Sequence, residues 1–211
     1  VEVDCAAAVL LLCTGTALPQ TAGVDTPATP PERPAILGHR GALMLAPENT
    51  LAAFGLSLAT GTDIELDVWP TKDGKLAVIH DGSVDRTTDG KGPVAALTLA
   101  QLKALDAGGW FHPDFTGERI PTLDEALQFI VRNERRPTVV AINIKPVSDV
   151  LIKGIIQAVR ETSMFDRSFV FDLSLDNVRR FKQCDPRIRC AASPRTRADI
   201  DKALALDLID V

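Results

Sequence analysis

From residue 34 onward, short apolar runs rich in β-branched residues alternate with longer stretches in which apolar positions recur every three or four residues. The short runs are typical of buried strands, and the longer stretches are typical of helices that lay one face on a sheet. The expected strands are 35–39, 62–68, 77–80, 139–145, 168–173, 187–193 and 206–211. The expected helices are 50–59, 99–106, 123–132, 149–161, 174–182 and 197–205. Two of them begin at a capping box, Thr98 with Gln101 and Thr122 with Glu125.

This alternation predicts repeated βα units around a parallel sheet, so the expected fold class is α/β, a (β/α)8 TIM-type barrel. Such barrels typically need about 250 residues and eight strands. Residues 34–211 number 211 − 33 = 178 and contain seven expected strands. We therefore expect an incomplete barrel over 34–211, truncated before its eighth strand.

Residues 1–33 differ from the rest, because alanine, threonine and proline dominate them. The apolar run 6–12 and the small residues after it resemble a secretory signal, and the remainder is typical of a linker. We therefore expect an exported protein, periplasmic or secreted, with a cytoplasmic location as the alternative. The longest apolar run, 6–13, is far shorter than the ~20 residues of a membrane helix, so no transmembrane span is predicted.

Charge and cysteine spacing exclude several other classes. The chain has 23 Lys and Arg against 28 Asp and Glu, a formal net charge of −5. This balance gives no electrostatic reason to bind nucleic acid, so nucleic acid is not an expected partner, and the motifs below indicate a small-molecule substrate instead. No C-x-x-C pair is present, which excludes a zinc ribbon and a dithiol redox motif. The spacing of Cys184 and Cys190 fits a small-loop disulfide or two reduced thiols, and the sequence gives no indication of the oligomeric state.

Candidate chemistry begins at the first two strands. Gly38-His39-Arg40-Gly41 lies where the first strand ends, and alternation in 62–68 sends Glu65 and Asp67 to one face. Helices cover the outer face of a barrel strand, so both carboxylates are expected in the interior. Two buried carboxylates repel each other unless a cation or a proton intervenes, which favours a hard divalent metal.

Two further strands are expected to bring polar side chains to the same rim. His80 ends the strand 77–80, and a second histidine beside paired acids suits acid and base catalysis near neutral pH. In 139–145, alternation turns Asn143 and Lys145 inward, and an inward lysine suits a phosphate. Each motif alone also has a structural interpretation. Asn49, for example, suits the N-cap of the next helix.

Together these motifs resemble the glycerophosphodiester phosphodiesterase family, in the superfamily of phosphatidylinositol-specific phospholipase C barrels. The resemblance extends over roughly 35–211. The matching stretches are HRG (39–41), PENT (47–50), ELDV (65–68), TKDG (71–74), HD (80–81), DRTTDGKG (85–92), RIPTLDEAL (119–127) and INIKP (142–146). The family also carries an insertion after its third strand, which corresponds to 82–120 here.

The resemblance implies that His39 and His80 form the acid/base pair and that Glu65 and Asp67 bind Ca²⁺ or Mg²⁺. The implied reaction is metal-dependent hydrolysis of glycerophosphodiesters to glycerol 3-phosphate and an alcohol.

The resemblance also assigns the remaining polar residues at this rim. It implies that Arg40 and Lys145 hold the phosphate, and that Glu48 orients His39 or contacts the metal. Asn143 departs from the family, because members typically place a glutamate there as a third metal ligand. An amide oxygen can still coordinate a metal but brings one negative charge less.

Two other functions remain open at this stage. A lipid phosphodiesterase resembling sphingomyelinase D or lysophospholipase D shares several of these motifs, and Trp69, Trp110 and Phe111 would then form its apolar rim. A noncatalytic phosphate-binding barrel is the second alternative. The TKDG stretch and the stretch 82–120 favour the glycerophosphodiester hydrolase.

Overall fold

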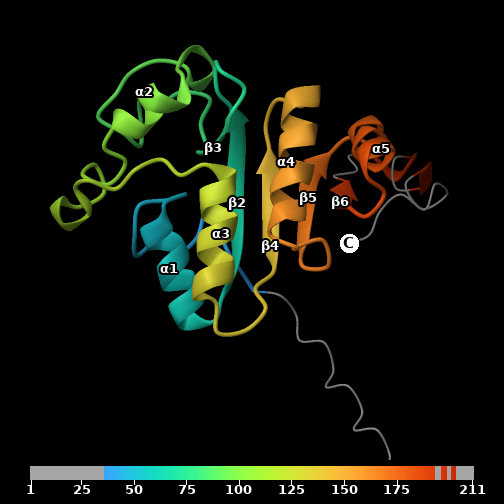
Figure 1. Ribbon diagram of the computed structural model, residues 1–211, viewed down its shortest axis with the longest axis horizontal. Coiled ribbons are helices and arrows are strands. Elements are labelled where there is room, and N and C mark those ends of the chain that lie inside the picture. The colour runs from blue at the N-terminus through green and yellow to red at the C-terminus, as the bar shows by residue number, and fades with distance from the viewer. Residues whose placement is uncertain (1–35, 193–195, 199–200, 203–211) are drawn as a thin grey trace, which may run out of the picture. The chain divides into compact units, whose positions relative to one another are not determined.

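The computed structural model describes residues 36–192, 196–198 and 201–202, and Figure 1 follows them from blue to red. Its elements are β1 (Leu37–Gly38), α1 (Leu51–Thr60), β2 (Asp63–Pro70), β3 (Leu76–Val78), η1 (Val94–Ala96), α2 (Leu99–Ala104), η2 (Pro113–Phe115), α3 (Leu123–Asn133), β4 (Val140–Ile144), α4 (Asp149–Glu161), β5 (Ser168–Leu173), α5 (Leu175–Cys184) and β6 (Arg189–Ala192). The expected leader, the strand 206–211 and most of the helix 197–205 lie outside the described residues.

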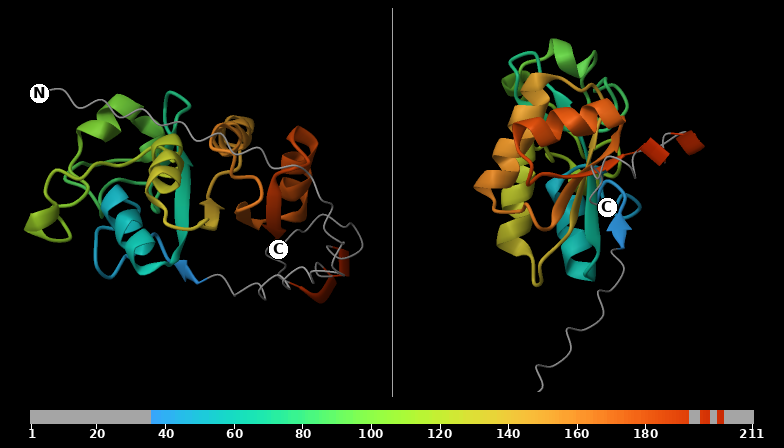
Figure 2. Two further views of the ribbon diagram at one scale, coloured as in Figure 1. Left: turned by 60° about the horizontal axis from the view of Figure 1, so that its bottom comes forward. Right: turned by 90° about the vertical axis from the view of Figure 1, so that its right-hand side faces the viewer.

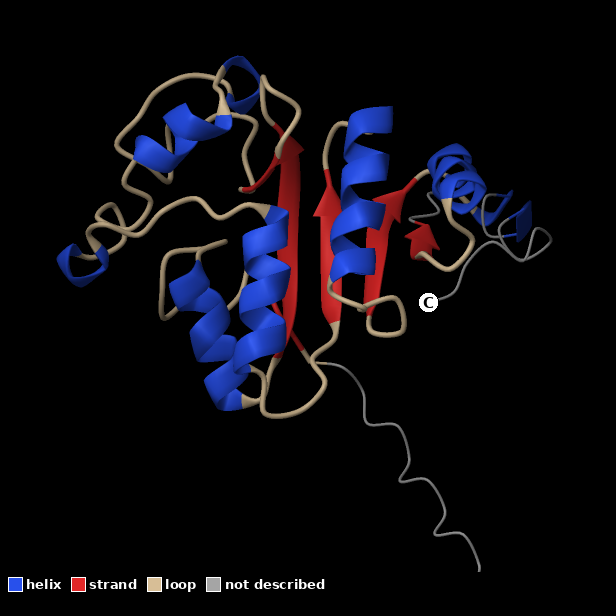
Figure 3. Ribbon diagram, in the orientation of Figure 1, coloured by secondary structure: helices blue, strands red, loops and turns tan. Residues whose placement is uncertain are grey.

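Five strands form a parallel sheet in the order β1-β2-β4-β5-β6, drawn in red in Figure 3. Each strand pairs with the next one in this order, and α3, α4 and α5 connect successive members from β2 onward. Because parallel strands need a crossover connection, this alternation of strand and helix produces the sheet. The predicted parallel α/β architecture is confirmed, and the bounds of β5 and α4 agree with the expected ranges.

The third strand contradicts the prediction of a uniformly parallel order. Strand β3 runs antiparallel to β2, with Val68 opposite Val78, and lies off the parallel path. The reason is the turn 71–74, in which Thr71 N donates to Lys75 O at 2.8 Å and Gly74 has φ +73°. A connection this short can join antiparallel strands only, whereas a parallel crossover takes a dozen residues or more. The end of β3 therefore returns to the level of Asp67, whose carbonyl accepts from Ile79 N at 3.0 Å.

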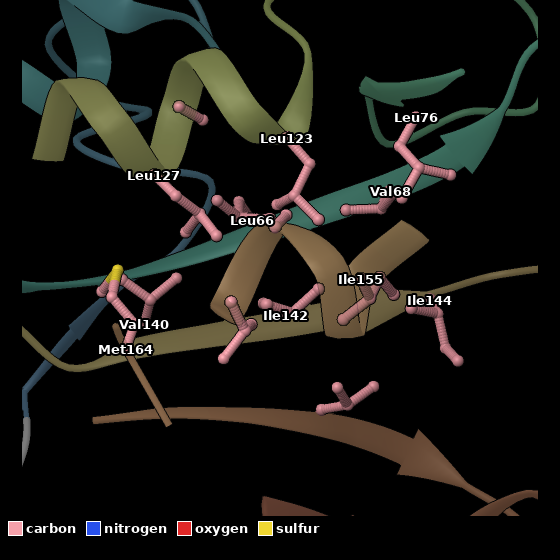
Figure 4. Packing of buried hydrophobic residues seen from close by; sticks show 14 of the residues in the cluster. Leu66, Val68, Leu76, Leu123, Leu127, Val140, Ile142, Ile144, Ile155 and Met164 are labelled. Atoms are coloured by element: carbon pink, nitrogen blue, oxygen red, sulfur yellow. The ribbon is translucent and has the colours of Figure 1, made fainter. Parts of the chain in front are cut away.

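Apolar residues of β2 and β4 pack against the helices on one face of the sheet. Leu66 and Ile142 are fully buried, and Figure 4 shows Leu66 beside Leu123 and Leu127 of α3 and Ile142 nearer to Ile155 of α4. Figure 2 shows α3 and α4 on the same side of the strands. The predicted alternation is confirmed, because the polar residues of β2 and β4 occupy the opposite face. None of the described helices is long and apolar enough to cross a bilayer.

The stretch 82–120 packs around a second, smaller apolar cluster. Ala77 of β3 and Ile79, which directly follows the strand, belong to this cluster, whereas Leu76 and Val78 belong to the larger core. The other buried members are Val84, Val94, Leu102, Ala107 and Ile120. The alternating faces of β3 thus attach this stretch to the sheet beside the end of β2.

The two cysteines near the C-terminal end of the described chain lie in different environments. Cys184 is exposed at the end of α5, and Cys190 is buried in β6. No disulfide joins them in the described part of the chain, and Cys190 Sγ donates to Ile188 O at 3.9 Å. The structure therefore favours two thiols over the disulfide.

Both predicted capping boxes are confirmed, and the one at α3 makes a stability prediction possible. Thr122 Oγ1 accepts from Glu125 N at 3.1 Å, and Glu125 Oε2 accepts from Thr122 N at 2.9 Å. We expect Thr122→Ala to lower the free energy of unfolding by about 1 kcal/mol, because a backbone donor loses its acceptor. Thr116→Ala is the matched control, since the Thr116 hydroxyl is exposed and makes no hydrogen bond within the described residues. Equal urea midpoints for the two variants would contradict the prediction.

Candidate active site

The turn after β1 brings Arg40 to the interior carboxylates. Arg40 and Gly41 both have positive φ, +53° and +77°, and Gly41 N donates to Glu65 O at 3.1 Å. A Cβ on Gly41 would lie 2.9 Å from Ala53 backbone, so only glycine fits this approach. The turn directs Arg40 N to Glu65 Oε2 at 2.7 Å and places Arg40 Nε 3.6 Å from Asp67 Oδ2.

Glu65 and Asp67 share the interior face of β2, as alternation predicted. Glu65 is 6% exposed and Asp67 is fully buried. Burial, followed by the negative charge of Asp67, raises the pKa of Glu65 to about 7. This shift is the electrostatic signature of two acids that repel each other in a poorly solvated place.

Asn49 holds Asp67 in position, a role that the sequence did not reveal. Its Nδ2 donates to Asp67 Oδ2 at 3.0 Å, and its Oδ1 accepts from Asp67 N at 3.2 Å. The interpretation of Asn49 as an N-cap is wrong, because the cap of α1 is Thr50, whose hydroxyl accepts from Ala53 N. Asn49 has φ +58°, a conformation that asparagine tolerates better than most residues and that turns its amide toward β2.

His39 lies at the open side of this cluster. Its side chain is 62% exposed, and its Nε2 lies 4.0 Å from Glu65 Oε2. Partial burial, followed by the positive charge of Arg40, lowers the pKa of His39. The imidazole is therefore accessible to a substrate and close to the paired acids.

His80 reaches the site because the hairpin turns back, and not as the end of a parallel strand. Its Nδ1 lies 2.7 Å from Asp81 Oδ1, and its carbonyl accepts from Trp69 Nε1 at 2.9 Å. Asp81 Oδ2 in turn accepts from Arg86 Nε at 2.7 Å, and this hydrogen bond lowers the pKa of Asp81 to about 2. An ionised Asp81 fixes the proton of His80 on Nδ1, which leaves Nε2 for chemistry.

Glu48 binds two arginines. Its Oε1 accepts from Arg40 Nη1 at 2.9 Å, and its two oxygens accept from Arg86 Nη2 and Nη1 at 2.7 and 2.8 Å. Burial alone would raise the pKa of Glu48, but the hydrogen bonds and charges of the two arginines lower it. This carboxylate therefore orients Arg40, a role that the sequence did not predict, and the expected contact of Glu48 with His39 or a metal stays a prediction.

Lys145 and Asn143 complete the interior face from β4. Lys145 Nζ lies 3.3 Å from Asp67 Oδ1, and Asn143 stands opposite Asp67 in the parallel register. Three buried polar atoms here, Asp67 Oδ1, Asn143 Oδ1 and Arg40 Nε, make no hydrogen bond within the described chain. Buried polar atoms are normally hydrogen-bonded, so these atoms, beside the Lys145 ammonium, leave binding capacity at the site that a cation and an anionic substrate could use.

The donor set fits a hard divalent cation when the amide is counted. Among the described residues, no three His, Cys, Asp or Glu side chains are arranged to bind a metal. Carboxylate and amide oxygens are the ligands that Ca²⁺ and Mg²⁺ prefer, and both ions accept water or phosphate oxygens as additional ligands. Glu65, Asp67 and Asn143 therefore fit such an ion with substrate or water completing the shell.

The polar residues that the sequence predicted for the site lie close to one another, through side-chain contacts or, for Asn143, through its register opposite Asp67. The structure brings together His39, Arg40, Glu48, Glu65, Asp67, His80, Asn143 and Lys145. Sequence reasoning missed Asn49 in its role on Asp67, and it missed Asp81 and Arg86. All three lie inside the motifs PENT, HD and DRTT, but only the folded chain shows that Arg86 reaches Glu48.

Residues 39–188 match the sequence profile of the "Glycerophosphoryl diester phosphodiesterase family". The chain belongs to this family. The glycerophosphodiester phosphodiesterase of Caldanaerobacter subterraneus subsp. tengcongensis is 42% identical over 160 residues. That match covers 73% of this chain and 64% of the relative, so the chain spans less than two thirds of the relative's length.

Solved structures of other family members have the same fold. The glycerophosphodiester phosphodiesterase of Agrobacterium tumefaciens str. C58 is 38% identical, with a TM-score of 0.66 over 74% of this chain and 65% of that chain. A phosphodiesterase of Oleispira antarctica, solved in complex with the product sn-glycerol-3-phosphate, is 30% identical. Its TM-score is 0.74 over 82% of this chain and 72% of that chain. The phosphodiesterase family assignment and the TIM-type barrel fold agree with the predictions from the sequence.

Proposed function

We propose that this chain catalyses the hydrolysis of glycerophosphodiesters to glycerol 3-phosphate and an alcohol, with a divalent cation bound by Glu65, Asp67 and Asn143. The observation that carries the proposal is a set of buried polar atoms on one interior face that make no hydrogen bond within the described residues. Asp67 Oδ1 and Asn143 Oδ1 offer oxygen ligands to a cation, and Arg40 Nε and the Lys145 ammonium beside them offer positive charge to a phosphate. Family membership and the product complex of the Oleispira relative support the choice of substrate.

Each side chain then has a task in the reaction. Arg40 and Lys145 bind the nonbridging oxygens of the phosphodiester and offset the charge that develops on them. Glu65, Asp67 and Asn143 would hold the divalent cation, which when bound would supply Lewis-acid polarisation of the phosphoryl oxygens. One histidine of the pair His39 and His80 removes a proton from the nucleophile, and the other donates a proton to the leaving alcohol oxygen.

The nucleophile is water, or the 2-hydroxyl of the glycerol moiety. With water, its oxygen attacks phosphorus, the bond to the alcohol breaks, and the two protons transferred leave glycerol 3-phosphate and a neutral alcohol. With the 2-hydroxyl, a cyclic phosphate forms first, and water then opens it. In both cases two histidines in different surroundings carry out the two proton transfers. His39 lies on the exposed side of the cluster, and His80 is held by Asp81.

Product identification from glycerophosphocholine tests this proposal. We expect release of choline and glycerol 3-phosphate. Phosphorus NMR and a coupled assay for glycerol 3-phosphate measure this release. Release of glycerol and phosphocholine would mean that the other phosphoester bond breaks. Absence of any product would refute the activity.

One observation favours a lipid diester as a second candidate substrate. Met44 and Leu45 are 82% and 62% exposed in the loop that carries His39 and Arg40. The aromatic rim expected for this alternative is only partly present, because Trp69 packs into the small apolar cluster and Trp110 is 40% exposed. Lysophosphatidylcholine and sphingomyelin therefore belong in the same substrate panel, and a preference for either over glycerophosphocholine would establish the lipid alternative.

Asn143 makes a prediction about metal affinity. We expect Asn143→Glu to tighten binding of Ca²⁺ or Mg²⁺ by roughly 5 to 150-fold, because affinity depends on the charge of the ligands. Turnover need not rise, since a third carboxylate also repels the phosphodiester. Calorimetric titration of both ions into both proteins measures the effect. Unchanged affinity for both ions would place Asn143 outside the cation's ligands.

A further inference from the structure

Arg86 makes three hydrogen bonds to two carboxylates that belong to different loops. Its Nη1 and Nη2 donate to Glu48 Oε2 and Oε1 at 2.8 and 2.7 Å, and its Nε donates to Asp81 Oδ2 at 2.7 Å. All three nitrogens of the guanidinium therefore have a carboxylate partner. The planar fork of arginine matches this arrangement, whereas a lysine ammonium offers a single point charge.

Each of the two carboxylates holds a side chain that the proposed reaction uses. Asp81 Oδ1 lies 2.7 Å from His80 Nδ1, and Glu48 Oε1 accepts from Arg40 Nη1 at 2.9 Å. Two chains of contacts thus begin at Arg86. One runs through Asp81 to the imidazole of His80, and the other runs through Glu48 to the guanidinium of Arg40.

We propose that Arg86 is a positioning residue of this site, which holds the His80 imidazole through Asp81 and the Arg40 guanidinium through Glu48 in one fixed arrangement. This inference rests on the proposed function, because it assigns Arg86 a role in the same reaction. The residues on which it acts come from two segments, the one that follows β1 and the one that follows β3. Through Glu48 and Asp81, Arg86 links the phosphate-binding side chain of Arg40 to the proton-transfer side chain of His80.

The physical reason for such a link is geometric precision. A general acid or base and a phosphate-binding group act on the same phosphorus centre, and small errors in their mutual placement cost large factors in rate. Without Arg86, and within the described part of the chain, Glu48 would keep only the hydrogen bond from Arg40, and Asp81 would keep only its contact with His80. The hydrogen bond from Arg86 also lowers the pKa of Asp81 to about 2, so this carboxylate stays ionised beside His80 even at acidic pH.

Arg86→Met is the first test, with Arg180→Met as the matched control. Arg180 also donates to a carboxylate, Asp149 Oδ1 at 2.7 Å, and its side chain is similarly exposed, 39% against 44%, but it lies on α5. We expect Arg86→Met to lower kcat/KM for glycerophosphocholine by about 10 to 100-fold, mostly through kcat, a typical cost of losing a supporting contact. Arg180→Met should match the wild type. Equal activity of the two variants, or a raised KM at unchanged kcat, would overturn the inference, since the latter result indicates direct substrate binding.

A double mutant that lacks both carboxylates distinguishes positioning from every other role of Arg86. In a Glu48→Gln, Asp81→Asn protein, Arg86 has lost both ionised partners, so the further change Arg86→Met should cost less than about threefold. A further loss as large as in the wild-type background would mean that Arg86 acts without these carboxylates. Arg86→Lys keeps the charge but not the fork, and we expect it to recover only part of the lost activity. Full activity of Arg86→Lys would mean that the charge alone is sufficient, which would contradict the positioning role. If Arg86→Met does not fold, Arg86→Lys takes its place as the test variant.

Imidazole nitrogen chemical shifts provide a readout that does not depend on turnover. In the wild type we expect the His80 proton on Nδ1, and in Arg86→Met a mixture of tautomers, with Arg180→Met unchanged from wild type. A wild-type chain that releases no glycerol 3-phosphate yet shows this His80 change would refute the proposed function and support the positioning role. An unchanged His80 signal in both Arg86→Met and Arg86→Lys would refute the positioning role.

Discussion

Replacing either histidine of the site by alanine is expected to lower kcat for glycerophosphocholine by about 10² to 10⁴-fold, the usual contribution of a positioned acid or base. His39 lies on the exposed side of the carboxylate pair, and His80 is held by Asp81, so neither side chain supports the apolar core. Both His39→Ala and His80→Ala should therefore melt close to the wild-type temperature.

His112→Ala is the matched control for this pair. His112 is exposed, caps the short turn η2 and accepts from Asp114 N, outside the cluster of site residues. Its replacement should leave turnover at the wild-type value. Near-wild-type kcat in His39→Ala or His80→Ala would remove that histidine from the mechanism.

The second large effect is expected for Glu65→Gln. Glutamine keeps the size of the side chain and an oxygen for the hydrogen bond from Arg40 N, so the turn after β1 should persist. The change removes one of two buried negative charges, and a metal that acts as a Lewis acid contributes several kcal/mol to the transition state. We therefore expect a loss of activity of at least ~10²-fold together with weaker binding of Ca²⁺ and Mg²⁺.

Calorimetric titration of the metal and a kinetic assay on the same protein check both parts of this prediction. Glu161→Gln, at the exposed end of α4, is the control for removing a carboxylate elsewhere. Wild-type activity of Glu65→Gln with unchanged metal dependence would contradict the assignment of Glu65 as a ligand.

Local sequence patterns predicted most of the fold. Alternation in β2 and β4 assigned Leu66 and Ile142 to the helix-covered face and Glu65 and Asn143 to the interior, because a strand has only two faces. The capping box at Thr122 fixed the start of α3, because a side chain and a backbone amide three residues apart satisfy each other locally.

The direction of β3 was predicted incorrectly although the necessary signal was present. Only a few residues separate β2 from β3, and the turn contains Gly74 at positive φ. The apolar run 77–80 has the composition of a parallel barrel strand, and composition does not report direction. The length of the connection does, since it is too short for a crossover.

The site residues that were missed depend on distant parts of the chain. Arg86 meets Glu48 across a sequence separation of 38 residues, and Asn49 meets Asp67 across 18. The charge of a residue and its neighbours in sequence do not show which of several partners it meets. For this reason the two arginine partners of Glu48, Arg40 and Arg86, were not predicted from the sequence.

The central claim is that Glu65, Asp67 and Asn143 bind a divalent cation that the hydrolysis of glycerophosphodiesters requires. The most direct measurement is the rate of glycerol 3-phosphate release from glycerophosphocholine by the full chain, before and after removal of metal with a chelator and after addition of Ca²⁺ or Mg²⁺. The account predicts that the rate falls to background with chelator and returns with one of the two ions, and that His80→Ala stays at background throughout. An unchanged rate in the chelated protein would contradict the account.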